Sequence, residues 1–225
     1  MLYKESFNEL MGYPTSSLGS EYLFTWYDSL KVNGMRGDWV LVANRGSEPA
    51  DVDIYVANVL RARYNAATGN PLAPGQMITP QFAGLVAGPV RVVCTNGQPV
   101  MASQRVLNRD SFEEVQGTPP STLSSDQVFT WYDSLRENSM HGDWVLAANN
   151  GSGTATVEIY VGGRKMHDPA NPANDFFTIP EGGMITPQFE NLIGGPVRVV
   201  CTSGQPLMVS QRVLFRYSPV YVSIP

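Results

Sequence analysis

Two identical blocks carry the residues most suited to ligand chemistry. The sequence Phe-Thr-Trp-Tyr-Asp-Ser-Leu occupies residues 24–30 and returns unchanged at residues 129–135. Aromatic rings stack on sugar rings, and a neighbouring carboxylate accepts hydrogen bonds from sugar hydroxyls, so the block has the composition of a carbohydrate platform. A structural explanation is stronger, because an inward tryptophan commonly anchors a β-sandwich core and an aspartate at a strand end commonly caps a turn.

Tyrosines on the outward faces of strands are the candidate ligand surface. Residue alternation predicts that four of them point away from the core, namely Tyr27, Tyr55, Tyr132 and Tyr160. A planar row of exposed rings on one sheet would bind a glycan, whereas scattered rings would not. Carbohydrate binding is therefore one alternative function.

Each copy has one cysteine placed four residues before a glutamine. The pairs are Cys94 with Gln98 and Cys201 with Gln205. Such a pair suggests an internal thioester of the kind that some surface adhesins use. A two-residue turn between the partners would send their side chains to opposite faces, so a buried thiol is the better explanation. Two cysteines at matching places also make no disulfide framework.

Histidines and acidic loops show no catalytic or metal-binding pattern. His141 and His167 occur only in the second copy, without a cysteine or second histidine at ligand spacing. Residues 167–175 are rich in oxygen ligands but lack the alternating acids of a calcium loop, so Asx and proline turns account for them. We expect no metal, no cofactor and no enzymatic activity. An unfamiliar active site would lie in the divergent loops at residues 58–76 and 162–181.

The chemistry-bearing residues belong to a duplicated framework. Trp26 and Trp131 are 105 positions apart, whereas Cys94 and Cys201 are 107 apart, so the second copy gains two residues between these points. A change of this size is tolerated in a surface loop. The duplication weighs against a single catalytic centre.

Fragments of the repeat flank the two copies. Residues 2–12 match residues 107–117, and a further trace begins at Leu214 and then departs from the pattern. The chain thus opens in mid-repeat, which indicates a segment of a longer tandem protein. A complete two-repeat protein is the alternative.

About seven strand-like runs per repeat predict an all-β fold. Turn residues separate the runs at the spacing of a β-sandwich, and no segment has a sustained helical period. In the first copy the runs are residues 6–10, 22–28, 39–44, 50–57, 77–82, 89–95 and 98–107. We expect two tandem immunoglobulin-like antiparallel β-sandwiches of about seven strands each.

Alternation and turn residues predict local detail within these runs. Tyr22, Phe24 and Trp26 share one face, which should point to the core. Gly37-Asp38 is expected to form a turn at the start of a strand.

Two tight turns predict hairpins. Asn96-Gly97 suits a type I′ turn with both central residues at positive φ. Residues 44–47 are expected to form the second hairpin, and the second copy keeps a glycine at both places.

The domain boundary depends on the strand at residues 6–10. If that strand begins a module, the domains are residues 1–108 and 109–217, with a strand-like tail at 218–225; this is the division we favour. If it ends the preceding module, the first residues are an orphan strand. The consecutive prolines Pro119 and Pro120 predict a semi-rigid joint between the modules.

The tail alternates like a strand. Its residues are Val220, Tyr221, Val222, Ser223 and Ile224. Such a strand would close the edge of the second domain or pair with another molecule. Self-assembly by strand addition is therefore a second alternative function.

Charge and hydropathy exclude further classes of function. The 225 residues carry a net charge of −5 without a Lys/Arg cluster, which excludes a typical nucleic-acid surface. No apolar run approaches the length of a membrane span, so we expect no membrane insertion. The chain shows no export signal of its own.

Four repeated blocks resemble tandem β-sandwich repeats of large prokaryotic secreted or cell-surface proteins, including surface-layer and adhesin-stalk types. The blocks are Phe-Thr-Trp-Tyr-Asp, Gly-Asp-Trp-Val-Leu, Gly-Pro-Val-Arg-Val-Val-Cys-Thr and Ser-Gln-Arg-Val-Leu. The resemblance covers the whole chain and implies an extracellular or cell-surface setting, no cofactor, and roles in spacing, assembly or attachment. The partners it implies are neighbouring repeats, cell-surface glycans or like subunits. We therefore expect a non-enzymatic structural module.

Overall fold

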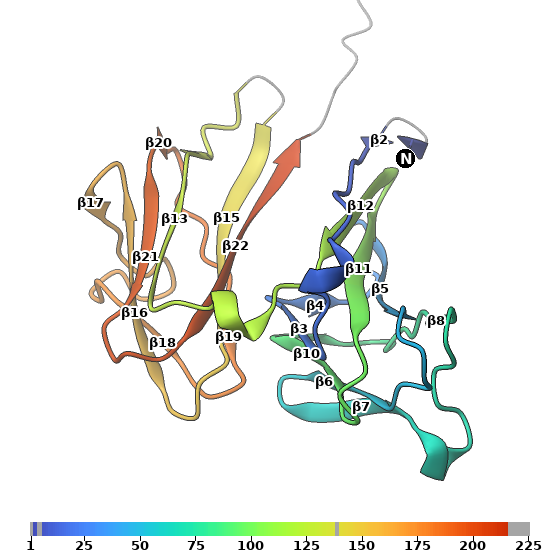
Figure 1. Ribbon diagram of the computed structural model, residues 1–225. Coiled ribbons are helices and arrows are strands. Elements are labelled where there is room, and N and C mark those ends of the chain that lie inside the picture. The colour runs from blue at the N-terminus through green and yellow to red at the C-terminus, as the bar shows by residue number, and fades with distance from the viewer. Residues whose placement is uncertain (1, 4–5, 138–139, 216–225) are drawn as a thin grey trace, which may run out of the picture. The chain divides into compact units, whose positions relative to one another are not determined.

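The protein is all-β and divides into two compact units. The computed structural model describes residues 2–3, 6–137 and 140–215 (Figure 1). The chain divides after Leu123, giving unit 1, Met1–Leu123, and unit 2, Ser124–Pro225. Three single-turn 3₁₀ helices interrupt the strands: η1 Thr15–Ser17, η2 Ala66–Thr68 and η3 Pro120–Thr122. Within the described residues, no helix has the length and apolar character needed to cross a membrane.

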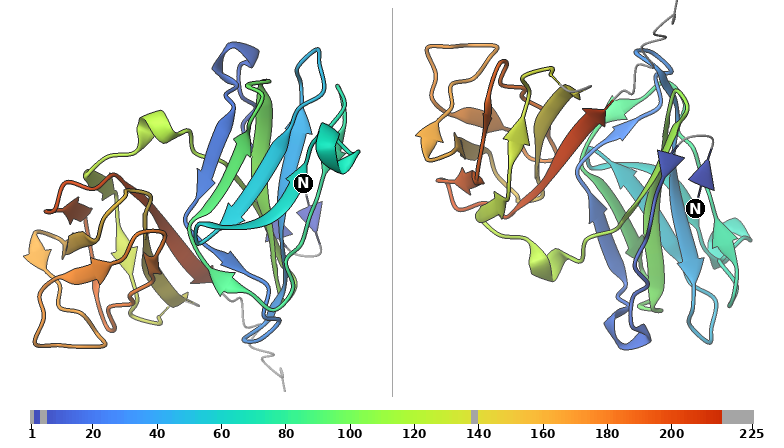
Figure 2. Two further views of the ribbon diagram at one scale, coloured as in Figure 1. Left: turned by 90° about the horizontal axis from the view of Figure 1, so that it is seen from below. Right: turned by 90° about the horizontal axis from the view of Figure 1, so that it is seen from above.

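Two antiparallel four-stranded sheets build unit 1 (Figures 1 and 2). The first has the order β3 Glu21–Phe24, β10 Val90–Cys94, β6 Val52–Val56 and β7 Val59–Tyr64. The second has the order β12 Ser111–Gln116, β11 Val100–Asn108, β5 Met35–Asn44 and β8 Met77–Ile78. Two short ribbons are separate: β1 Leu2–Tyr3 pairs with β2 Ser6–Phe7, and β4 Tyr27–Asp28 pairs with β9 Val86–Ala87.

The two large sheets of unit 1 contribute to one hydrophobic core. Along β6, the alternate residues Val52, Ile54 and Val56 are fully buried, as strand periodicity predicts. The other buried members come from both sheets and their connections: Tyr22, Phe24, Tyr27, Val40, Val42, Ala50, Leu72, Val90, Val92, Cys94, Val100 and Ala102. The core of unit 1 therefore depends on side chains from both sheets.

The expected core face of β3 is confirmed only in part. Tyr22 and Phe24 are buried, but Trp26 is half-buried, because β3 ends at Phe24 and the alternation does not continue past that point. The turn expected at Gly37-Asp38 is wrong, since both residues lie inside β5.

Unit 2 has a corresponding set of strands. One sheet has the order β13 Asp126–Phe129, β21 Val197–Cys201, β16 Ala155–Val161 and β17 Arg164–Lys165, and β18 Phe177–Ile179 also pairs with β16. The other has the order β19 Met184–Ile185, β15 Met140–Asn149 and β22 Leu207–Phe215, while β14 Tyr132–Asp133 pairs with β20 Ile193–Gly194. Both sheets contribute to a core that includes Val145, Ala147, Val157, Ile159, Val197, Val199 and Leu207.

Both predicted hairpins are wrong, because each turn leads from one sheet to the other. The turn after Cys94 joins β10 of the first sheet to β11 of the second. The amide of Gly97 donates to the carbonyl of Cys94 over 3.2 Å, and Gly97 has φ of 76°. Asn96 is not at positive φ, so the turn is not type I′. The segment after Asn44 likewise joins β5 to β6.

The strand that follows residue 108 belongs to unit 1. β12 pairs antiparallel with β11, with Glu114 opposite Arg105. The units therefore divide after Leu123 and not at the predicted boundary between residues 108 and 109. The alternative, in which this strand ends the preceding module, agrees with the pairing. The tail at residues 220–224 lies outside the described residues.

The two divergent stretches contain more regular structure than predicted. Residues 58–76 hold β7 and η2, and residues 162–181 hold β17 and β18. The extra strands widen the β3- and β13-containing sheets, because β7 and β17 pair with β6 and β16.

Candidate functional site

A buried aspartate links the duplicated block of unit 1 to the second sheet. Asp38 lies on β5 and has no exposed surface. Its Oδ2 accepts hydrogen bonds from Gln104 Nε2 at 2.7 Å and from the Asp28 amide at 2.9 Å. Gln104, on β11, also donates to the carbonyl of Trp26 at 2.7 Å. We call Asp38, Gln104 and the groups they bind the polar hub of unit 1.

Tyr27 extends this hub and is not a surface residue. Its hydroxyl donates to the Asp38 carbonyl at 2.8 Å and accepts from the Phe82 amide at 2.7 Å. Ser29 donates to the Phe82 carbonyl. Burial raises the pKa of Tyr27 to about 12. The prediction that Tyr27 and Tyr132 point outward is wrong, because both lie in short strands beyond the end of β3 or β13 and are fully buried.

Unit 2 builds the same hub. Asp143 Oδ2 accepts from Gln211 Nε2 at 2.6 Å and from the Asp133 amide at 2.9 Å. Tyr132 donates to the Asp143 carbonyl at 2.7 Å and accepts from the Phe189 amide at 2.7 Å. The repeated residues thus occupy matching places in two matching networks.

Burial controls the ionisation of Asp143. It raises the pKa of this carboxyl to about 6, while the hydrogen bonds from Asp133 and Gln211 lower it. Among the described residues, Asp143 Oδ1 has no hydrogen-bond partner. A carboxyl of this pKa acts as a general acid only where a substrate reaches it, and Asp143 has no exposed surface.

Asn44, a second polar residue that recurs in unit 2, stabilises the segment that connects β5 to β6. Asn44 Nδ2 donates to the carbonyls of Glu48 at 2.8 Å and Leu72 at 2.7 Å, and its Oδ1 accepts from the Gly46 amide at 2.8 Å. Asn149 makes the equivalent three bonds in unit 2. Because these donors and acceptors are buried or partly buried, the pairing removes a desolvation cost.

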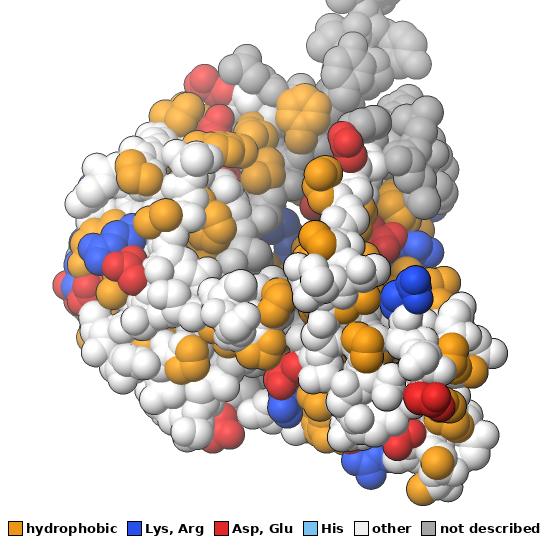
Figure 3. All heavy atoms as spheres, viewed as in Figure 1, with side chains coloured by type: hydrophobic (Ala, Val, Ile, Leu, Met, Phe, Trp, Pro, Cys, Tyr) orange, Lys and Arg blue, Asp and Glu red, His pale blue; other side chains and the backbone are white. Residues whose placement is uncertain are grey.

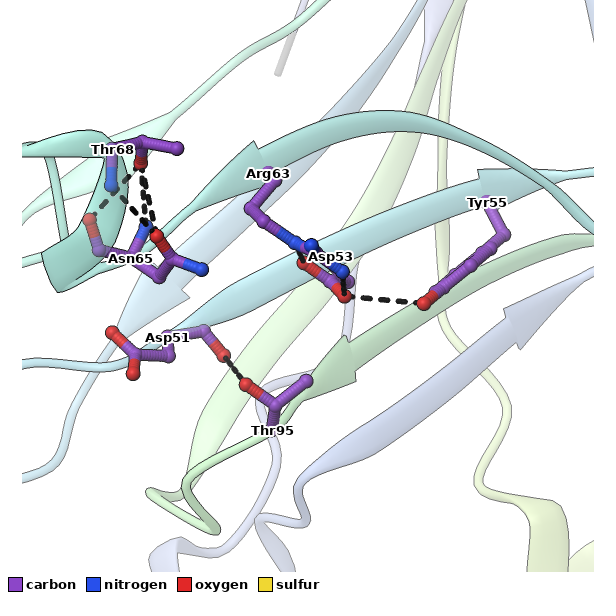
Figure 4. A network of polar contacts seen from close by, with 7 residues as sticks. All are labelled: Asp51, Asp53, Tyr55, Arg63, Asn65, Thr68 and Thr95. Atoms are coloured by element: carbon purple, nitrogen blue, oxygen red, sulfur yellow. Dashed lines mark hydrogen bonds and ion pairs between the residues drawn. The ribbon is translucent and has the colours of Figure 1, made fainter.

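A polar cluster on β6 and β7 of unit 1 consists of Asp53, Tyr55 and Arg63, as Figure 4 shows. Arg63 donates from Nε to Asp53 Oδ1 at 2.7 Å and from Nη2 to Asp53 Oδ2 at 2.6 Å, and Tyr55 donates to Asp53 Oδ2 at 3.1 Å. These hydrogen bonds, led by that of Arg63, hold the pKa of Asp53 below its usual range. The carboxylate is therefore fully used by its neighbours.

The same view shows how the ends of β6 and β7 are fixed. Asn65 Oδ1 accepts from the Thr68 amide at 2.9 Å, and Thr68 Oγ1 accepts from the Asn65 amide at 3.1 Å, which closes a capping box on η2. Thr95 donates to the Asp51 carbonyl at 3.2 Å. These contacts are structural.

The remaining two candidate tyrosines have the same surroundings in each unit. Both are half-buried, and the Arg91 guanidinium lies 5.8 Å from the centre of the Tyr55 ring. Tyr160 donates to Glu158 at 2.5 Å, and Lys165 donates to Glu158 at 2.8 Å. Each unit thus holds one such tyrosine inside a polar cluster, which does not form a planar row of exposed rings.

Both cysteines are free and buried, as predicted. Cys94 Sγ lies 3.1 Å from Asn96 Oδ1, and burial raises the pKa of its thiol. A high pKa keeps the thiol protonated and unreactive.

The acidic loop of unit 2 is organised by its own turns. The Asp168 side chain accepts from the Ala170 amide at 2.9 Å, and Asp175 forms an ion pair with Lys165 at 2.9 Å. Among the described residues, no group of three or more histidine, cysteine or acidic side chains is arranged to hold a metal.

Two of the hollows among the described residues lie in unit 2 and are open to solvent. One, of about 460 Å³, is lined by residues that include Asp168, Phe177 and Gln188. The other, of about 530 Å³, is lined by Val128, Phe129, Thr130, Pro196 and Gln211. In the space-filling view of Figure 3, hydrophobic side chains lie in small dispersed groups between polar ones.

The sequence did not identify the hubs: Asp38 was predicted to lie in a turn, and Gln104 was given no role. Asp38 and Gln104 recur as Asp143 and Gln211, and this recurrence of two hydrogen-bonding residues was the available signal. Their pairing could not be found because they are far apart in sequence and meet only when β5 and β11 pair.

Comparisons with known proteins give no functional assignment. No protein-family model matches the chain, and no curated protein matches it. A solved structure of an anti-sigma factor domain-containing protein is similar at a TM-score of 0.25 and 8% identity, over 85% of this chain and 77% of that chain. A TM-score of this size establishes no common fold.

Proposed function

We propose that this protein is a non-enzymatic structural module, in which two immunoglobulin-like β-sandwich units act as a spacer or assembly element of an extracellular or cell-surface repeat protein. The main support is the use of the repeated polar residues. Asp38 and Gln104 in unit 1, like Asp143 and Gln211 in unit 2, bond to one another inside the fold. Polar residues of the kind that a ligand site would present to solvent are instead used to tie the aromatic block to the β5–β11 or β15–β22 strand pair.

Mechanical function follows from where these bonds lie. In each unit a hub bridges the long strand pair, β5 with β11 or β15 with β22, and the segment carrying the aromatic block. Pulling on a unit must break backbone ladders and buried polar contacts together. Such cooperative structures unfold in single steps.

Single-molecule pulling of the full chain tests the proposal. We expect two unfolding events, which release roughly 430 Å of chain for unit 1 and roughly 360 Å for unit 2 at about 3.5 Å per extended residue. Tyr27→Phe removes one bridging hydroxyl, so it should lower the force of one event and leave the other unchanged. A single non-cooperative extension would contradict the proposal.

A glycan array serves as the competing test. Binding that is lost in the double variant Tyr55→Ala and Tyr160→Ala would replace the structural proposal with carbohydrate recognition. The matched control is Tyr64→Ala, because Tyr64 is also half-buried in unit 1 but packs against the core.

A further inference from the structure

Three asparagines in the chain directly precede a glycine. They are Asn33, Asn96 and Asn150. An asparagine in this position is open to a chemical change that needs only the chain itself and water. The structure gives the three asparagines different surroundings, so they should differ in how readily they react.

The reaction begins when the backbone nitrogen of the glycine attacks the side-chain carbonyl carbon of the asparagine. A new C–N bond closes a cyclic imide, and the C–N bond to the side-chain amide breaks to release ammonia. Water then opens the ring at either carbonyl and leaves aspartate or isoaspartate. Glycine favours the attack because it has no Cβ beside its nitrogen. The attack also requires an asparagine side chain and a glycine amide that are not held by other hydrogen bonds.

Asn96 is held at every group that would react. Its Oδ1 accepts from the Asp51 amide at 3.1 Å, and its Nδ2 donates to the Pro49 carbonyl at 2.9 Å. The Gly97 amide donates to the Cys94 carbonyl at 3.2 Å. At least three hydrogen bonds must therefore break before Gly97 can attack.

Asn150 is protected by its neighbours. The Gly151 amide donates to Asn149 Oδ1 at 2.9 Å, which occupies the attacking nitrogen. Asn150 Nδ2 is buried, so the leaving amide is shielded from water.

Asn33 lacks both kinds of protection. Its side chain is exposed. Among the residues that the structure describes, neither this side chain nor the Gly34 amide forms a hydrogen bond. The turn closes through the Met35 amide, which donates to the Val32 carbonyl at 2.9 Å. The reacting groups are thus free while the turn itself is formed.

The geometry of this turn calls for the reactive dipeptide. Asn33 has φ of 52° and Gly34 has φ of 91°, and a turn with two central residues at positive φ prefers Asn-Gly. A Cβ on Gly34 would also stand 2.7 Å from Arg109 Nε. A side chain that could shield the nitrogen of Gly34 would therefore strain the turn.

We propose that Asn33 is a site of spontaneous deamidation in the folded protein. The Gly34 nitrogen displaces ammonia from the side chain of Asn33, and one water molecule opens the imide to isoaspartate or aspartate. No oxidation or reduction takes place. The modification goes beyond the proposed structural function and does not depend on it.

Isoaspartate at this position would disturb the start of β5. It adds one carbon atom to the main chain between Asn33 and Gly34, so the hydrogen bonds on either side of the insertion cannot keep their spacing. One of them runs from the Arg109 amide to the Gly34 carbonyl at 2.7 Å. β5 begins at Met35 and carries Asp38 of the polar hub. The reaction therefore links the age of the molecule to the stability of unit 1.

The corresponding dipeptide of unit 2 is Asn138-Ser139, which lies outside the described residues. The serine side chain hinders attack by its own backbone nitrogen. We therefore expect the change to be faster in unit 1 than at this place in unit 2.

Peptide mapping by mass spectrometry tests the site, with the full chain stored at physiological temperature in heavy-oxygen water. The isotope marks each new carboxylate, because its oxygen comes from the solvent. In the folded chain, Asn33 should convert more than about tenfold faster than Asn96 or Asn150, since each additional hydrogen bond that must open slows the reaction severalfold. In denaturant the three should convert at similar rates. Conversion should also speed up as the pH rises, because the attacking nitrogen must lose its proton.

Hydrogen exchange of the stored chain tests the consequence. Peptides that cover Met35 should lose protection in step with isoaspartate, while those from β10 should not. Asn33→Gly tolerates the positive φ and has no side-chain amide, so its protection should not change on storage. Freshly prepared Asn33→Asp carries the new charge without the added carbon atom, so it should keep the protection of the parent. Unchanged circular dichroism of both fresh variants would show that they fold.

Two results would overturn the proposal. One is an Asn33 that keeps its amide as long as Asn96 and Asn150 in the folded chain, and the other is conversion of all three at one rate without denaturant. Isoaspartate at Asn33 with unchanged exchange at Met35 would overturn the link to unit 1 stability.

Discussion

The two units contain the same polar hub but protect it to different extents. In unit 1, Gln104 is buried, and the edge strand β3 is covered by Thr118, which exchanges two backbone hydrogen bonds with Leu23. In unit 2, Gln211 makes the same two bonds yet is half-buried and lines an open hollow. The repeat therefore preserves the hydrogen bonds of the hub. The two units differ in how far the glutamine of the hub is exposed to solvent.

The ion pairs on the outer faces of the two units use different residue types but keep the same interaction. In the hubs, by contrast, the residue types are the same and their exposure differs. Unit 1 pairs Asp53 with Arg63, and unit 2 pairs Glu158 with Lys165. A tyrosine donates to the acid in both units. Surface pairs tolerate such exchange because only charge and reach are needed, while the buried hub requires one acceptor geometry.

The largest effect should come from removing the hub carboxylate. Asp38→Ala removes the acceptor of the Asp28 amide and one of the two acceptors of Gln104 Nε2 in a buried site, which should cost about 2–5 kcal/mol of unfolding free energy in unit 1. Asp143→Ala should cost less, because Gln211 is half-buried and can turn to water. Hydrogen exchange followed by mass spectrometry reports each unit separately.

Equal effects of the two substitutions would contradict the proposed difference between the hubs of units 1 and 2. So would a loss of protection from hydrogen exchange in unit 2 that equals the loss in unit 1 on Asp38→Ala. As a control, Asp110→Ala removes an exposed acid of unit 1 and should leave protection of the hub strands unchanged.

The pH dependence of unit 2 should give the next largest effect. The folded pKa of Asp143, about 6, lies above the ordinary value, so this group adds stability below pH 4 that is lost as the pH rises through 6. Asp143→Asn keeps an acceptor oxygen but cannot ionise, so it should remove a loss of about 2 kcal/mol between pH 4 and 7.

Denaturant unfolding of the parent and of Asp143→Asn at pH 4, 5, 6 and 7 checks this. A parallel pair of pH profiles would show that Asp143 does not titrate in this range. The other acids with shifted pKa act in the reverse direction and at lower pH, so the two contributions separate on the pH axis.

The sequence revealed the period, the strands and the buried faces, because these follow from local alternation. Tyr22 and Phe24 were assigned correctly to the core in this way. Alternation failed at Trp26 and Tyr27, where β3 ends and β4 begins after a break that no side-chain pattern marks. Because of that break, Tyr27 and Tyr132 were predicted to be exposed although both are buried.

Turn residues predicted where the chain reverses but not which sheet receives it. Asn96-Gly97 marks a true turn, yet β10 and β11 belong to different sheets. Sheet membership depends on contacts between distant strands, such as β11 with β5, which local signals do not encode. The meeting of Asp38 with Gln104 was hidden for the same reason.

The smallest effect should come from the outer-face pairs, and it sharpens the contrast with the hub. Hydrogen bonds from Arg63 and Lys165 lower the pKa of Asp53 and Glu158. A lowered folded pKa adds stability above the unfolded value and loses it as the pH falls, so Arg63→Met should flatten the acid limb of unit 1. The loss at neutral pH should be smaller than either effect above, because water screens the half-exposed guanidinium. Lys165→Met should do the same in unit 2, and acid unfolding followed by peptide-level exchange would detect both. If either variant destabilised its unit as much as Asp38→Ala, the distinction between an exchangeable surface pair and an invariant buried hub would not hold.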